Sequence, residues 1–98
     1  MGGLVTSAQA GTLESNDILI TVLPTYDGCG VVIELESIVL AQYGEAIRQT
    51  MRRILEEEMI EDIYIKAVDR GALDFTIEAR VRTALERAGY IEKEAAHG

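Results

Sequence analysis

The chain has 98 residues, which suits one small domain and leaves no room for two. Hydrophobic residues make up 48% of the composition, so the chain can bury a core and is not of a disordered class. The formal net charge of −8 repels nucleic-acid phosphates and anionic lipids. We therefore expect neither nucleic acid nor membrane as a partner; the charge favours a basic protein partner or serves solubility alone.

Cysteine usage and the start of the chain indicate a cytoplasmic protein. Cys29 is the only cysteine, which excludes an internal disulfide and a CxxC metal or redox pair. No apolar run reaches the length of a membrane span, and the first residues lack the basic and apolar regions of a secretory signal.

The first third of the chain predicts an arm and two strands. Residues 1–14 are small and polar with little periodicity, so we expect a flexible N-terminal arm. Residues 18–23 form a β-branched apolar run that ends at Pro24. After a turn, residues 31–36 alternate with a period of two. The two strands are expected to pair as an antiparallel hairpin.

A helical stripe follows over residues 38–58, for which Ser37 is the expected N-cap. The apolar residues recur at steps of three and four: Leu40, Tyr43, Ile47, Met51, Ile54 and Leu55. Residues 62–68 alternate again and predict a third strand. A second helix is expected from Ala72 to a stop at Gly89, although residues 74–77 also fit a short strand.

The predicted fold class is α+β: a small single-domain sandwich in the order β-β-α-β-α, with a three-stranded sheet and two helices on one face. The third strand follows a helix, so it is free to run parallel to its neighbour in the sheet. Residues 15–90 form the expected domain, and residues 91–98 a frayed C-terminal tail.

Catalytic and metal-binding constellations are missing from the sequence. The only histidine, His97, falls in the predicted tail, which leaves no Ser-His-Asp or Cys-His arrangement and no metal-ligand set. Nucleotide-binding glycine motifs are absent as well. Carboxylate runs such as residues 56–58 fit solvated helix-end charge. We therefore predict that the chain is not an enzyme and has no catalytic or metal site.

Three segments, in order, resemble the acyl carrier protein (gamma subunit) family of citrate lyase. Residues 10–17 (AGTLESND) resemble its N-terminal signature, and residues 42–48 (QYGEAIR) its middle helix. Residues 69–74 (DRGALD) resemble its second signature, followed by an arginine-rich helix at residues 79–82 (ARVR). The resemblance spans residues 10–88, and Asn16 stands where several relatives have Gly or Ser.

This resemblance implies that Ser15 is the cofactor-binding residue of an acyl carrier domain. It would bear a 2'-(5''-phosphoribosyl)-3'-dephospho-CoA arm through a phosphodiester, attached by a holo-carrier synthase, the prosthetic group transferase. The arm would present acetyl and citryl thioesters to the alpha (acyl transferase) and beta (lyase) subunits of citrate lyase, as citrate becomes acetate and oxaloacetate. The candidate docking surfaces are the helix faces with Glu45, Arg48, Arg52, Arg80 and Arg82, although solvation explains them equally well.

The residues themselves are compatible with this role. Ser15 lies beside the predicted arm, and the only bases near it in sequence are Glu14 and Asp17, so its hydroxyl suits modification by another enzyme. Taken without the resemblance, residues 15–17 read as a polar turn before a strand. Two alternatives stay open: a carrier for a related lyase or decarboxylase (citramalate, malonate), and an unmodified acidic protein-interaction module.

Overall fold

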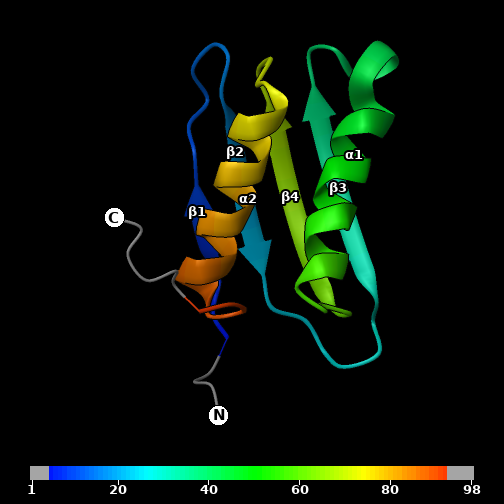
Figure 1. The fold of residues 1–98 in the computed structure, drawn as a ribbon, viewed down its shortest axis with the longest axis vertical. Helices are drawn as coiled ribbons and strands as arrows, with labels where there is room; N and C mark the ends of the chain where they lie inside the picture. Colours follow the sequence, from blue (N-terminus) through cyan, green and yellow to red (C-terminus); the bar gives the residue numbers. More distant parts are fainter. Residues whose placement is uncertain (1–4, 93–98) are drawn as a thin grey trace.

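The computed structural model describes residues 5–92. It contains four strands and two helices, in the order β1 (Ala8–Ala10), β2 (Ile18–Leu23), β3 (Val31–Ser37), α1 (Leu40–Glu57), β4 (Ile63–Asp69) and α2 (Asp74–Ala88). Both helices lie on one face of a single sheet (Figure 1), which confirms the predicted α+β class and layering. None of the helices within the described range has the length and apolar character of a membrane span.

The core lies between the sheet and the two helices. Alternate residues of β2 and β4 are buried, as the period of two requires when one face of a sheet is covered. The helices close this layer with the buried side chains of Ile47, Met51, Ile54, Leu55, Ile77, Val81, Ala84 and Leu85.

The sheet differs from the prediction in strand number and order. It has four strands, β1-β2-β4-β3, and β4 lies between the two strands expected to form a hairpin. β2 pairs antiparallel with β4, and β3 pairs parallel with β4. The hairpin prediction is wrong because residues 24–30 cross the end of β4 instead of making a tight turn, while α1 returns the chain beside β3.

The additional strand, β1, lies within residues 1–14, which the sequence assigns to an arm. It is only three residues long and pairs antiparallel with the outer edge of β2. Alanine and glutamine have weak β-propensity, so the sequence of β1 carries no strand pattern. Residues 1–4 and 93–98, including most of the predicted tail and His97, lie outside the described range.

The helix ends differ in part from the prediction. α1 begins at Leu40 with Val39 at the cap position, so the prediction of Ser37 as N-cap is wrong; Ser37 is the last residue of β3. α2 begins at Asp74, which makes the first turn helical and not a strand. Gly89 ends α2 in the left-handed conformation (φ 90°), which confirms the expected stop.

Candidate functional site

Ser15 lies in the β1–β2 connection, at the end of the molecule drawn at the top of Figure 1. The β3–α1 and β4–α2 connections meet there too. Two backbone hydrogen bonds join loop 11–17 to the end of β4: Asn16 N donates to Arg70 O (2.8 Å), and Arg70 N donates to Asp17 O (2.8 Å). The first and second signature segments are thus neighbours in space.

The carboxylate of Asp17 anchors this loop to α2. Arg80 donates to both of its oxygens, from Nε to Oδ1 at 2.9 Å and from Nη2 to Oδ2 at 3.1 Å. Thr12 Oγ1 and the backbone N–H of Ile18 donate to the same group, each at 2.7 Å. The hydrogen bond from Arg80, which outweighs the opposing effect of burial, lowers the pKa of Asp17 from 3.8 to about 2.

The hydroxyl of Ser15 is accessible. Ser15 is exposed in a turn, and its side chain makes no hydrogen bond to any part of the chain that the structure describes. The Asp17 carboxylate is a poor base because it is held by Arg80 and its pKa is about 2. No side chain within residues 5–92 is hydrogen-bonded to this hydroxyl, so none is placed to take its proton in this conformation. Among these residues, no three His, Cys, Asp or Glu side chains are grouped to hold a metal ion.

The other two serines have different surroundings. Ser7 is exposed and precedes β1, outside loop 11–17. Ser37 is half-buried, and its Oγ donates to Asp69 Oδ2 at 2.8 Å. Ser15 is thus the serine that combines an accessible hydroxyl with a loop whose next two residues are hydrogen-bonded to the end of β4.

Asp69 organises the adjacent connection. Its side chain is 1% exposed and also accepts hydrogen bonds from the backbone N–H groups of Gly71 (3.2 Å) and Ala72 (3.0 Å). Together with Ser37, these donors satisfy the buried carboxylate and tie β3, β4 and the start of α2 together.

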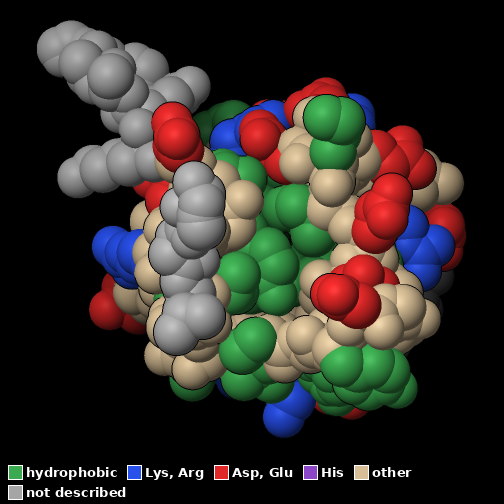
Figure 2. Space-filling model, turned by 90° about the horizontal axis from the view of Figure 1, so that it is seen from below, with side chains coloured by type: hydrophobic (Ala, Val, Ile, Leu, Met, Phe, Trp, Pro, Cys, Tyr) green, Lys and Arg blue, Asp and Glu red, His purple; other side chains and the backbone are tan. Residues whose placement is uncertain are grey.

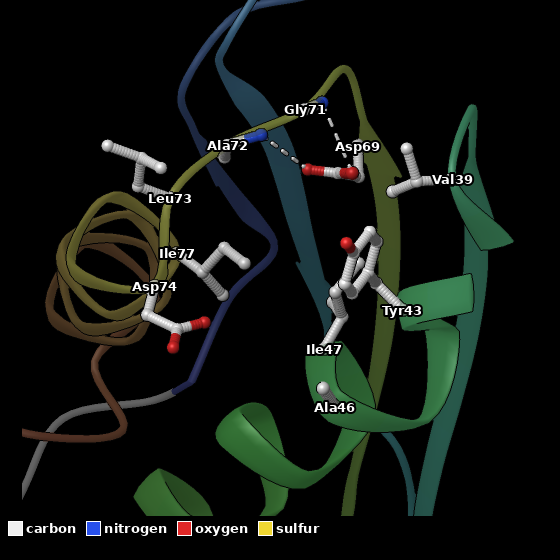
Figure 3. A pocket seen from close by; sticks show the side chains of 10 residues that line it. All are labelled: Val39, Tyr43, Ala46, Ile47, Asp69, Gly71, Ala72, Leu73, Asp74 and Ile77. Atoms are coloured by element: carbon white, nitrogen blue, oxygen red, sulfur yellow. Dashed lines mark hydrogen bonds between the residues drawn. The ribbon is translucent and has the colours of Figure 1, made fainter.

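A groove of about 410 Å³ opens between the first turns of α1 and α2, beside this connection. Ile47 and Ile77 form its floor, while Tyr43 and Asp74 lie toward its opening (Figure 3). The complete lining is Val39, Tyr43, Ala46, Ile47, Asp69, Gly71, Ala72, Leu73, Asp74 and Ile77.

Exposed hydrophobic side chains surround the same end. We call this group the apolar rim; its members, each more than half exposed, are Leu13, Ile38, Tyr43, Leu73 and Phe75. At the opposite end, hydrophobic side chains also reach the surface, but acidic side chains flank them (Figure 2). Loop 11–17 therefore lies beside an exposed apolar surface, a feature that solubility alone does not explain.

Sequence reasoning singled out Ser15 but missed the residues that hold it. Asp17 and Arg80 lie in two of the resembling segments, so their proximity is a contact between signatures that one sequence does not reveal. Arg80 and Arg82, predicted as candidate docking residues, instead pair with Asp17 and with Glu57 and Glu58.

The Asp17–Arg80 pair predicts a specific acid dependence of stability. The pKa of Asp17 is below its ordinary value of 3.8, so the pair stabilises the fold fully above that pH and is lost as pH falls toward 2. Asp17→Asn should cost about 1–2 kcal/mol at pH 7, allowing for the exposure of Arg80. The difference from wild type should shrink between pH 4 and pH 2 in urea unfolding.

Glu78→Gln, which removes the exposed partner of Arg53, is the matched control. Its effect on the free energy of unfolding should stay below about 0.5 kcal/mol. Equal effects of both substitutions at pH 7 would contradict the anchoring role of Asp17.

Ser15 is thus exposed on a loop that the Asp17–Arg80 pair ties to the rest of a small α+β domain. The family model of the malonate decarboxylase delta subunit (MdcD) matches residues 5–88. The citrate lyase acyl carrier protein of Halothermothrix orenii is 49% identical over 84% of this chain and 85% of its own. That of Streptococcus uberis is 43% identical over 92% and 87%. The chain belongs to the citrate lyase acyl carrier protein family.

A solved structure supports the fold independently of close sequence similarity. A chain in the crystal structure of a Pseudomonas malonate decarboxylase hetero-tetramer in complex with malonate superposes with a TM-score of 0.74. The match covers 89% of this chain and 90% of that one at 19% identity. It shows that the two chains share this fold.

Proposed function

We propose that this chain is the non-catalytic carrier subunit of a citrate lyase complex, and that Ser15 carries its prosthetic group. The observation that carries the proposal is the accessible hydroxyl of Ser15, which lies within the family's first signature and on a loop anchored by Asp17. No side chain among residues 5–92 is hydrogen-bonded to this hydroxyl, which fits attachment by a separate holo-carrier synthase.

The group that fits is 2'-(5''-phosphoribosyl)-3'-dephospho-CoA, joined through a phosphodiester. Such a linkage needs an accessible serine oxygen, which would attack phosphorus of the activated precursor as the serine proton and the precursor's leaving group depart on the synthase. Ser15 is exposed in a turn, which leaves room for a large substituent. Once bound, the group supplies the thiol that holds acetyl or citryl as a thioester. The chain itself supplies a fixed attachment point and a high local concentration of the acyl group at the alpha and beta subunits.

Similarity to malonate decarboxylase proteins favours one alternative, a carrier for a related decarboxylase. The attachment chemistry at Ser15 would be the same, and only the acyl group and partner subunits would differ. Measuring the turnover of citrate, citramalate and malonate by the purified complex distinguishes a citrate lyase carrier from a carrier of a related system. We expect citrate to be consumed fastest. Fastest turnover of either other substrate would assign the carrier to that system.

Modification can be mapped by proteolysis, because cleavage after glutamate separates the three serines. Fragments 1–14, 15–34 and 37–45 contain Ser7, Ser15 and Ser37, respectively. After reaction with the holo-carrier synthase and its precursor, mass spectrometry should find the increment on fragment 15–34. If the modified serine slows cleavage after Glu14, the increment should appear on fragment 1–34 and persist in Ser7→Ala. An increment on Ser7 or Ser37 would overturn the assignment.

A further inference from the structure

The groove between α1 and α2 has no part in the attachment at Ser15. The side chains of its floor are almost completely buried, with Ile47 5% and Ile77 1% exposed. Ala46 of α1 lines the groove and is exposed. Its volume of about 410 Å³ lies within the range of small-molecule sites.

The groove lies next to the point of attachment. Gly71 lines it, and a Cβ atom built on Gly71 would lie 3.6 Å from Oδ1 of Asn16, the residue that follows Ser15. A group tethered to Ser15 therefore begins its path at the edge of the groove. Such a tether presents its free end at an effective concentration of about 1 mM, so even weak affinity fills the site part of the time.

The charges around the groove restrict what it can accept. Two carboxylates, Asp69 and Asp74, contribute to the lining, whereas none of the ten lining residues is lysine or arginine. The remaining surface is mainly aliphatic, with the aromatic ring of Tyr43 at one side. A neutral, apolar group gains from burial here, but a carboxylate would lose hydration and face two like charges.

We propose that this groove holds the acetylated thiol end of the chain's own arm and excludes the citryl end. The inference rests on the proposed function, because it takes Ser15 as the point of attachment. In the resting acetyl form, the thioester would be sheltered from water between Tyr43, Ile47 and Ile77. In the citryl form, the same end would stay outside, free to enter a partner subunit.

The test uses the full-length protein carrying the arm at Ser15, without partner subunits. Methyl NMR should show that acetylation shifts the δ1 methyls of Ile47 and Ile77, while Ile63, at the far end of β4, serves as the internal reference. The citryl form should leave all three methyls as they are with the free thiol. Hydrolysis of the acetyl thioester should be about two- to five-fold slower than that of acetyl-CoA, as expected for partial occupancy at millimolar affinity.

Ala46→Leu fills the groove from an exposed position of α1, so it should abolish the methyl shifts and restore the acetyl-CoA hydrolysis rate. Ala79→Leu, on an exposed position of α2 outside the lining, is the matched control and should keep both effects. Methyl shifts that the citryl form also produces, or protection unchanged by Ala46→Leu, would overturn the inference. The proposed function fails in a different experiment: it is wrong if reaction with the holo-carrier synthase adds no mass at Ser15. If Ala46→Leu does not fold, the acetyl–citryl comparison on wild type decides alone.

Discussion

Ser15→Ala should reduce citrate lyase turnover to background in a complex rebuilt from the alpha and beta subunits, this chain and the holo-carrier synthase. Without the hydroxyl no phosphodiester forms, so the acyl group loses its tether. The gain from tethering suggests a fall in rate of at least about 10²-fold. Citrate-dependent oxaloacetate formation measures the rate, and intact mass shows whether the arm is present.

Ser7→Ala is the matched control, because Ser7 is also an exposed serine but lies outside loop 11–17. It should retain both activity and the mass increment. Ser15→Ala should change the free energy of unfolding by less than about 0.5 kcal/mol, since its side chain has no partner among the described residues. Full turnover by Ser15→Ala would contradict the carrier role of this residue.

Gly11→Ala should destabilise the fold more than the same substitution at Gly28. Gly11 has φ of 96°, and an added Cβ would lie 1.8 Å from the carbonyl oxygen of Ile18 and 3.2 Å from Cδ of Arg80. Positive φ and the required backbone shift together cost roughly 2–5 kcal/mol. For a domain of this size, that corresponds to a fall in melting temperature of roughly 10–30 °C.

Gly28→Ala isolates the conformational part of this cost. Gly28 has nearly the same backbone angle, φ of 90°, but an added Cβ meets nothing within 4 Å. Its melting temperature should fall by roughly 4–16 °C, less than that of Gly11→Ala. Thermal unfolding of both variants measures the difference, and equal shifts would show that the contact with Ile18 relaxes without cost. Because Gly11 begins the loop that holds Ser15, its variant should also be modified more slowly.

The sequence predicted most of the layers of this fold, because periodicity reports burial directly. Alternation located β3 and β4, a β-branched apolar run located β2, and the helical stripe with Met51 at its centre located α1. Periodicity did not predict the strand order, because the strand that lies between β2 and β3 is set by contacts between residues far apart in the chain. β1 was missed because three residues without β-propensity carry no periodic pattern.

The candidate site divides in the same way. Ser15 was predicted as the attachment site through a segment that resembles a family, since an exposed serine has no local chemical signature of its own. The Asp17–Arg80 contact joins a loop to a helix across the domain, so only the fold reveals it. The groove likewise requires both helices in place, because α1 and α2 each contribute part of the lining.

The hydrogen bonds that tie loop 11–17 to Arg70 and Arg80 have a consequence for delivery. If Ser15 carries the arm as proposed, these bonds fix the attachment point of the arm to the body of the domain, so movement of the loop adds little to the reach of the arm. The arm can then serve two active sites only if both lie within its own length of this fixed point. Any greater separation between those sites must be covered by reorienting the whole carrier domain.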